Sequence, residues 1–255
     1  DNVTIYSSGA PIKLFEHAKL IINNAVFKFY STTKITIYLY DESEVVISNS
    51  TADTSVRIYL YAWDQSKITL RNTDMYTYVY CHDYSSIEIH DTCNRITLYL
   101  YDDSTGTLNS SYISFTPNIY CYGSSQLSIY YSNYTNIIHC HDYSYLYVGY
   151  SYVYSIEQYE NSTAYLEYTN CSSIEARGDS FLNIYQCNIS DTLRMMWTND
   201  IIAMSGPGAC GLIYYSYINK LYLYSGRVTR IISSYVNYLM YFPCLLYTSD
   251  AADDG

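Results

Sequence analysis

A nine-residue pattern repeats along this chain and limits what the chain can fold into. The segment Leu39 to Ile47 reads apolar-Tyr-Asp-x-Ser-x-apolar-x-apolar, and a closely similar skeleton returns six more times. In every copy the serine lies four residues after the first apolar position, and the last apolar position lies eight residues after it. An eighth copy, at 60–70, carries two extra residues around Trp63. The six further copies occupy residues 81–89, 100–108, 121–129, 140–148, 158–166 and 176–184.

The period of the repeat predicts the fold. Successive copies begin 18 to 21 residues apart, with alternating apolar and polar residues and no helical pattern between them. Such a short strand repeat predicts a solenoid, in which each coil packs only on its neighbours. Alternation turns Ile37 and Leu39 inward before the corner, and Val45 and Ile47 inward after it. A third inward position recurs at Met75, Cys93, Val153, Cys171 and Ile189. We therefore predict an all-β, single-stranded parallel β-helix with three sides per coil.

The regularity of the repeat divides the chain into four parts. Residues 1–34 are expected to form irregular entry coils, and residues 35–196 the regular β-helix. Residues 197–243 are expected to form degenerate final coils that include a Gly/Pro-rich loop at 205–211. Residues 244–255 resemble a translated sequencing-library adapter, so we interpret them as an artefactual tail. A capping repeat is then expected to be missing at the C-terminal end.

The residue types at the corner suggest how it is held together. Corner aspartates such as Asp41 can bond their own downstream backbone in an Asx-type turn, while Gly123 and Gly178 supply positive φ. The corner serines would stack into a hydroxyl ladder along the solenoid. Cysteines at inward positions are expected to be free core thiols, because parallel stacked side chains such as Cys121 and Cys140 point alike.

Composition excludes several classes of function. The net charge is −11 and charged residues make up only 15% of the chain, so binding to nucleic acid or to an anionic membrane is disfavoured. The chain has no apolar run of about eighteen residues, so no membrane span is predicted. Nothing in the sequence indicates a cofactor. The outlying residue type is tyrosine, with 37 copies.

Many of these tyrosines fall on outward positions of successive coils. Large exposed aromatic surfaces usually mark binding or association, although cross-strand aromatic pairs also stabilise a sheet by themselves. Sugar rings would stack on such a face while phenol hydroxyls bonded the sugar hydroxyls. The predicted ligand-binding face consists of Tyr38, Tyr40, Tyr59, Tyr61, Tyr80, His82, Tyr99, Tyr101, Tyr120, Tyr122, His139 and His141.

Other clusters offer weaker chemistry. Glu157 and Glu175 occupy equivalent outward positions in adjacent coils beside Arg177, which would suit a retaining glycosidase or a lyase. A solvated charge cluster is the simpler interpretation. Metal binding by stacked corner carboxylates such as Asp83 and Asp102, or Asp142 and Glu160, is a further alternative, as is chelation by His139 and His141. The repeated Cys-His-Asp-Tyr-Ser at 81–85 and 140–144 is not expected to be catalytic, because adjacent strand residues point to opposite faces.

The period and the alternation resemble those of right-handed parallel β-helix proteins over roughly residues 12–240. This group includes phage tailspikes, surface adhesins and polysaccharide-cleaving enzymes, so the resemblance implies an extracellular or virion-surface location. It specifies the architecture and not the activity. The sequence favours a non-catalytic surface solenoid that binds glycan or associates with like solenoid modules, as a homo-oligomer or a lateral assembly. A polysaccharide lyase or glycoside hydrolase is the first alternative, and a purely structural filament module is the second.

Overall fold

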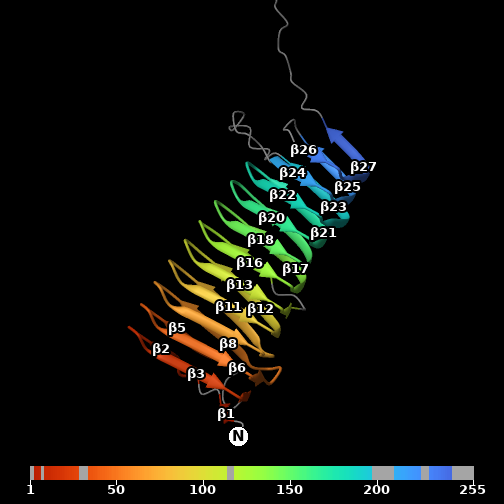
Figure 1. Ribbon diagram of the computed structural model, residues 1–255. Helices are drawn as coiled ribbons and strands as arrows, with labels where there is room; N and C mark the ends of the chain where they lie inside the picture. Colours follow the sequence, from red (N-terminus) through yellow and green to blue (C-terminus); the bar gives the residue numbers. More distant parts are fainter. Residues whose placement is uncertain are drawn as a thin grey trace, which may run out of the picture.

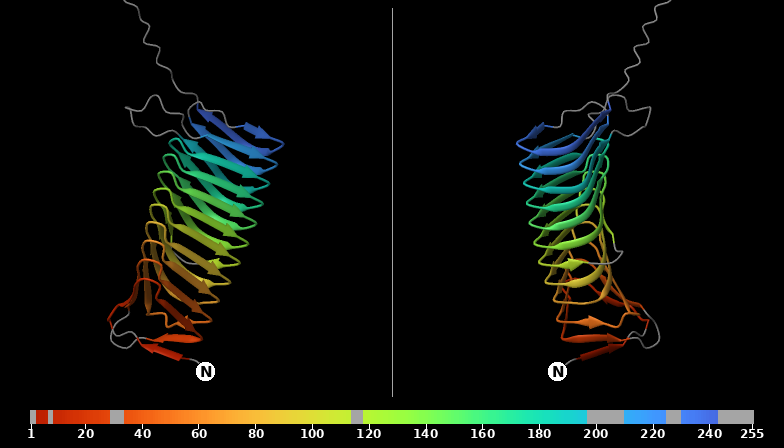
Figure 2. Two further views of the ribbon diagram at one scale, coloured as in Figure 1. Left: turned by 60° about the vertical axis from the view of Figure 1, so that its left-hand side comes forward. Right: turned by 90° about the vertical axis from the view of Figure 1, so that its right-hand side faces the viewer.

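The chain folds as a parallel β-solenoid, as predicted. The computed structural model describes residues 3–6, 9–28, 34–113, 118–196, 210–224 and 230–242. These ranges contain no helix, and they form about ten coils of about 19 residues each. Figure 1 shows the coils stacked along one axis, and Figure 2 shows the two long sheets facing each other across a narrow core.

Three parallel sheets build the solenoid. The thirteen-stranded sheet contains β2 (Ile12–Leu14), β5 (Lys34–Leu39), β8 (Arg57–Ala62), β10 (Tyr76–Cys81), β12 (Cys93–Leu100), β14 (Tyr112–Ile113), β15 (Ile119–Cys121), β17 (Asn133–Cys140), β19 (Tyr152–Gln158), β21 (Asn170–Arg177), β23 (Asn188–Met196), β25 (Tyr217–Tyr224) and β27 (Tyr235–Phe242). The eleven-stranded sheet contains β3 (Lys19–Asn23), β6 (Glu44–Ser48), β9 (Lys67–Arg71), β11 (Ser86–His90), β13 (Thr105–Asn109), β16 (Gln126–Tyr130), β18 (Tyr145–Gly149), β20 (Thr163–Glu167), β22 (Phe181–Tyr185), β24 (Cys210–Tyr214) and β26 (Arg230–Ile232). The third sheet contains β1 (Val3–Tyr6), β4 (Ala25–Lys28) and β7 (Thr51–Ala52).

The core lies between the sheets and is filled by the inward residues of each strand. In β8, Ile58, Leu60 and Ala62 are fully buried, while Tyr59 and Tyr61 between them face outward. The third inward position is buried as well, for example at Val153 and Ile189. Outside the third sheet, this position lies at the start of the strands of the thirteen-stranded sheet, as the pairing of β12 with β14 shows.

Between Leu39 and Cys187, coil length varies only on the third side. The second corner, where the strands of the eleven-stranded sheet end, follows the first inward position by eleven residues in each of these coils, as from Leu39 to Ser50 and from Ala62 to Thr73. In the next coil Met195 pairs with Ala176, and the second-corner residue Ser216 follows Met195 by 21 residues. The return to the next coil takes twelve residues after Ser50 but only eight after Thr73. The two long sheets therefore keep a fixed register while the third side absorbs the differences between coils.

The first corner is held by a carboxylate that bonds to the preceding coil. The corner residues have left-handed backbones, with φ of 57° at Asp142, 58° at Glu160 and 66° at Gly123. Asp142 Oδ2 accepts a hydrogen bond from the Gly123 N–H at 2.9 Å, and Glu160 Oε2 accepts one from the Asp142 N–H at 2.9 Å. The predicted Asx turn within one coil is therefore replaced by a bond between coils. In-register stacking brings each corner N–H within reach of the next corner's side chain.

Hydroxyl groups link successive coils regularly at the second corner, whereas at the first corner Ser85 Oγ donates to the Ala62 carbonyl of the preceding coil at 3.3 Å. Ser132 Oγ accepts from the Ser111 N–H at 3.1 Å and donates to the Tyr130 carbonyl at 2.7 Å. Ser151 repeats this pair of bonds one coil later. The first-corner serines stack coil on coil, which gives the predicted column of hydroxyl groups. Within the described chain, buried first-corner hydroxyls have no hydrogen-bond partner at Ser66, Ser104, Ser125, Ser144, Ser162 and Ser180.

One coil departs from the predicted register. The sequence pattern suggested Leu60 as its first apolar position, with two extra residues around Trp63. In the structure Leu39 pairs with Ala62, so Ala62 to Ser66 follows the corner skeleton without an insertion. The extra residues lie instead on the third side, which bulges out as β7. The alternation allowed both registers, because Leu60 and Ala62 both face the core.

The buried cysteines are free, as predicted. Cys81, Cys121, Cys140, Cys171 and Cys187 are unpaired thiols. Burial raises the pKa of the Cys81 thiol to about 12. Cys187, which the sequence did not place, occupies a second-corner position and donates to the Tyr185 carbonyl. The described residues include no helix that is long and apolar enough to cross a membrane. Residues 205–209 of the predicted loop, the tail at 244–255, and the side chains of Cys93 and Cys210 lie outside the described residues.

Candidate functional site: an aromatic face

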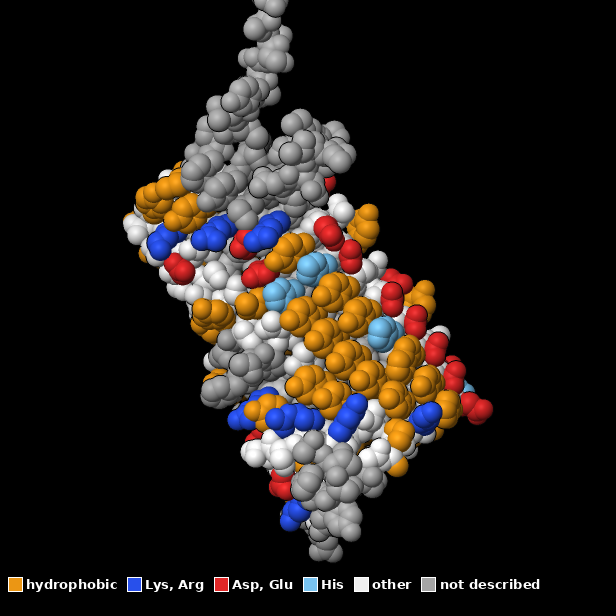
Figure 3. Space-filling model, turned by 180° about the vertical axis from the view of Figure 1, so that it is seen from behind, with side chains coloured by type: hydrophobic (Ala, Val, Ile, Leu, Met, Phe, Trp, Pro, Cys, Tyr) orange, Lys and Arg blue, Asp and Glu red, His pale blue; other side chains and the backbone are white. Residues whose placement is uncertain are grey.

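Two columns of aromatic rings run along the outward side of the thirteen-stranded sheet. Figure 3 shows them as a continuous patch bordered on one side by a row of acidic side chains. We call the two columns together the aromatic face. The first column contains Tyr38, Tyr61, Tyr80, Tyr99, Tyr120 and His139. The second contains Phe15, Tyr40, Trp63, His82, Tyr101, Tyr122, His141 and Tyr159.

The rings of each column lie face to face. From Tyr61 to His139 the ring centroids are 4.7 to 4.9 Å apart and the ring planes differ by 2° to 8°. This spacing matches the separation of neighbouring strands, about 4.8 Å, so the register of the sheet sets it. Each ring therefore covers the faces of its neighbours and presents its edge and its polar tip to solvent. The sugar stacking suggested by the sequence needs uncovered ring faces, which the interior of these columns does not offer.

Most of the predicted face residues fall into the two columns, but the register of one coil changes the membership. Tyr59 pairs with Thr36 and Tyr78, and its ring stacks on Tyr78 at 4.8 Å in a third, short column. Its predicted place in the face is taken by Trp63, which lies between Tyr40 and His82 in the second column.

One long edge of the aromatic face is basic, near the starts of β5, β8 and β12. The Lys34 ammonium lies 4.4 Å from the centre of the Tyr59 ring. The guanidinium groups of Arg57 and Arg95 lie 4.0 and 4.2 Å from the centre of the Tyr76 ring, one coil on either side of it. These cations are attracted by the negative faces of the rings, which holds them against the sheet.

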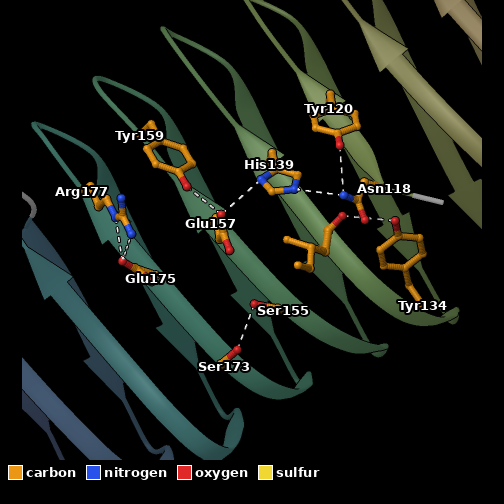
Figure 4. A network of polar contacts seen from close by, with 11 residues as sticks. Asn118, Tyr120, Tyr134, His139, Ser155, Glu157, Tyr159, Ser173, Glu175 and Arg177 are labelled. Carbon is orange, nitrogen blue, oxygen red and sulfur yellow. Dashed lines mark hydrogen bonds and ion pairs between the residues drawn. The ribbon is translucent and has the colours of Figure 1, made fainter. Parts of the chain in front are cut away.

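The C-terminal end of the aromatic face carries the predicted cluster of Glu157, Glu175 and Arg177, drawn in Figure 4. Glu157 Oε2 accepts a hydrogen bond from the Tyr159 hydroxyl at 2.6 Å and lies 3.2 Å from His139 Nδ1. Arg177 Nε donates to Glu175 Oε1 at 2.6 Å, and a second guanidinium nitrogen contacts the same oxygen. The aromatic columns therefore end in a network of paired charges.

This geometry bears on the cleavage hypothesis. The structure places Glu157 and Glu175 in register on adjacent strands, beside a depression of about 190 Å³ that Asp191 and Arg194 also line. A nucleophile or a general acid must reach a substrate without a competing partner. Here Tyr159 and Arg177 already occupy the two carboxylates. The cluster fixes the positions of charged groups at the end of the aromatic face. Because both carboxylates already have partners, neither is free to act as a nucleophile or a general acid.

Burial within the columns changes the acidity of their members. Desolvation, reinforced by Tyr61 and Tyr99 on either side, raises the pKa of Tyr80 to about 12. Desolvation, followed by the hydrogen bond to Glu157, raises the pKa of Tyr159 to about 12. Desolvation lowers the pKa of His139, against the opposing effect of the nearby Glu157 carboxylate. At neutral pH these pKa shifts favour uncharged rings.

The possible metal ligands are engaged otherwise. His139 and His141 share a face, but each stacks on a tyrosine of its own column, at 4.8 and 4.9 Å. Asp102 Oδ2 accepts a hydrogen bond from the Asp83 N–H at 3.4 Å. In the described parts of the chain, no three His, Cys, Asp or Glu side chains are grouped so as to hold a metal ion.

Sequence reasoning missed three members of the aromatic face. Trp63 was hidden by the register of its coil. Phe15 belongs to an entry coil where the corner has Glu16 in place of aspartate. Tyr159 lies in the same coil as Glu157, one coil beyond His139 and His141, the last predicted members of the face. Counting outward positions back from each corner serine would have found Trp63 and Tyr159.

No model of a protein family matches this chain, and searches of curated proteins and of solved structures give no match either. We therefore argue the function from the geometry of the aromatic face.

Proposed function

We propose that this chain is a non-catalytic solenoid module that associates with a second copy of itself through the aromatic face. The observation that carries the proposal is the covering of ring faces within the columns. What remains available is a flat grid of ring edges and hydroxyls, repeated at the spacing of the coils. A second solenoid presents the same grid at the same spacing, so its rows match along the whole face.

The charges at the two ends favour an antiparallel pair. Strand register places Lys13 beside Tyr38 at one end of the first column and Glu157 and Glu175 at the other, with Tyr99 midway. A two-fold axis near Tyr99 would bring Lys13 of one copy over the Glu157 and Glu175 end of the other. Arg177 pairs with Glu175 there, while Glu157 is bonded to the neutral Tyr159 hydroxyl and keeps its charge for Lys13. A parallel pair would instead place like charges together, which is unfavourable.

The size of the face predicts a weak association. Eight rings of the second column, stacked at about 4.8 Å, extend for about 34 Å. With a width of about 15 Å for two neighbouring columns, each copy would bury about 500 Å², which lies in the range of transient interfaces. We therefore expect dimers or lateral assemblies at high local concentration, and monomers in dilute solution.

Sedimentation velocity of the full chain, from micromolar to millimolar concentration, tests this. We expect reversible dimerisation that Tyr99→Lys weakens at least about tenfold, because the two-fold axis brings the two introduced ammonium groups together. Tyr152→Lys, at an exposed position outside the columns, is the matched control and should leave dimerisation unchanged. A chain that stays monomeric throughout, or equal effects of the two substitutions, would refute the proposal.

Glycan binding is the second candidate, and the rows of phenol hydroxyls favour it. A panel of neutral polysaccharides, followed for retention and for new reducing or unsaturated ends, separates the alternatives. Retention that Tyr101→Ser and Tyr122→Ser abolish would support glycan binding along the face. Product formation that is lost with Glu157→Gln or Glu175→Gln would support cleavage instead.

A further inference from the structure

A groove on the eleven-stranded sheet is lined by aromatic rings that do not stack on one another. It has a volume of about 440 Å³ and lies across β18, β20, β22 and β24, on the side of the solenoid away from the aromatic face. Figure 1 shows these four strands next to each other in the C-terminal half of the stack. The groove is lined by Tyr147, Tyr165, Glu167, Asn183, Tyr185 and Tyr214.

The rings here are arranged differently from those of the aromatic face. Tyr147 is tilted by 36° against Tyr130, and Tyr185 meets Tyr168 edge-on at 87°. Among the described ring contacts, none joins two of the four tyrosines that line the groove. Their faces are therefore not covered by one another, and a ligand can lie against them.

A glycine and a carboxylate fix the shape of one wall. Gly149 pairs with Glu167 in the next coil, and a Cβ at Gly149 would lie 2.9 Å from Tyr147 Cε1. The missing side chain leaves the space that the Tyr147 ring occupies. From there the Tyr147 hydroxyl donates to Glu167 Oε2 at 2.8 Å. One carboxylate oxygen is thereby tied to the wall, and the second remains for a ligand.

We propose that this groove binds an organic ammonium group, such as the trimethylammonium group of choline or of trimethylated lysine. Aromatic faces attract cations through the ring quadrupole, and cages of several rings are the common way to recognise quaternary ammonium. Glu167 supplies the opposite charge, and the described lining residues include no Lys or Arg. The net charge of −11 also raises the local concentration of cations.

A neutral sugar is the competing ligand, since it could use the same ring faces together with the Asn183 amide. The two ligands differ in their need for charge. Choline and 3,3-dimethyl-1-butanol have nearly the same shape, and only choline is charged. Their comparison on the full chain, by NMR chemical-shift titration or calorimetry, isolates the electrostatic contribution.

We expect choline to bind at least about tenfold more tightly than its neutral analogue. Glu167→Gln should weaken choline binding at least about fivefold, and Tyr165→Leu, which keeps an apolar side chain but removes a ring, should also weaken it. Glu44→Gln is the matched control, because Glu44 lies on the same sheet, five strands from β18 in the sheet order, and pairs with Lys19. The circular dichroism of each variant shows whether it has folded.

Equal binding of choline and its neutral analogue, binding that Glu167→Gln leaves unchanged, or no binding of choline at all would overturn the proposal. Preferential retention of neutral sugars in the groove would overturn it as well. A trimethyl-lysine peptide is measured beside free choline to identify the source of the ammonium group. Tighter binding of the peptide indicates a modified protein, and tighter binding of choline indicates a small molecule. The proposal does not depend on association through the aromatic face, so Tyr99→Lys should leave choline binding unchanged.

Discussion

Single residues in this solenoid are constrained chiefly by the residues directly above and below them in the stack. The corner carboxylates accept a hydrogen bond from a backbone N–H of the preceding coil, and each ring in a column of the aromatic face covers the faces of its neighbours. A side chain therefore acts on two coils at once. This explains why aspartate, with a short acceptor and a tolerance for left-handed backbone, recurs at the first corner.

The same stacking predicts how stability depends on pH. Burial raises the pKa of Tyr80 and of Tyr159 to about 12, from an ordinary value of 10.0. Because the folded chain holds the phenol proton more tightly than the unfolded chain does, this contribution to stability is fully present below pH 10 and is lost as the pH rises towards 12. The melting temperature should therefore fall between pH 10 and pH 12. The melting temperature of the Tyr80→Phe variant, which cannot ionise at this position, should fall less steeply with pH than that of the parent chain. Equal slopes of melting temperature against pH for the two proteins would show that Tyr80 ionisation is not the cause.

At the scale of the strand and the coil, the fixed and variable parts of the repeat should respond differently to insertion. Two residues inserted after Asp74, on the third side, would give a return of ten residues, a length already present between Ser111 and Cys121. We expect the melting temperature to fall by only a few degrees, because loops tolerate insertion well. The same two residues inserted after Ile87 in β11 would displace the corner from its neighbours and leave inward residues unmatched.

The measurement is thermal unfolding followed by circular dichroism in the strand region. The insertion in β11 should lower the melting temperature several times more than the insertion after Asp74. It should also lower the cooperativity of unfolding, since each coil is stabilised by its neighbours. Similar losses for the two insertions would mean that the third side is as constrained as the sheets.

The sequence was sufficient to predict the coils, their period and the free core thiols, because inward alternation and short-range turn chemistry repeat in every copy. Alternation alone could not decide the register of the coil that contains Ala62 and Trp63, since Leu60 is equally suited to the core. The spacing of four residues back from Ser66 does decide it. The sequence could not predict the orientation of the rings. Alternation says that Tyr80 and Tyr147 both face outward, but only the neighbours decide that one is stacked on both sides while the other lies across Gly149.

At the scale of the whole molecule, the two long sheets offer opposite chemistry from similar residues. On the thirteen-stranded sheet, the parallel rings cover the faces of their neighbours, so that only ring edges and hydroxyl groups are exposed to solvent. On the eleven-stranded sheet, tilted rings, a glycine and a carboxylate leave faces around a groove. A solenoid that pairs through the first sheet keeps the second accessible, so the two proposed activities are compatible in one assembly.

The direction of pairing is the property that the whole solenoid determines, and it can be measured. Lys13 continues the register of the first column one strand beyond Tyr38, and so lies four strands from Tyr99. At about 4.8 Å per strand, two-fold pairing near Tyr99 puts the two copies of position 13 about 40 Å apart, against less than about 20 Å in a parallel pair. Spin labels on Lys13→Cys, with distances from pulsed electron resonance at high protein concentration, distinguish these arrangements.

The labelling needs two controls. The five described cysteines are buried, so at those positions labelling requires unfolding, and the unsubstituted chain gives the background from all other cysteines. A label at Thr97→Cys, beside Tyr99, should give a short distance in both arrangements and so reports that pairing occurs. A short distance at Thr97 with a long one at position 13 supports the antiparallel pair. Short distances at both positions would show that the charges at the ends do not decide the orientation.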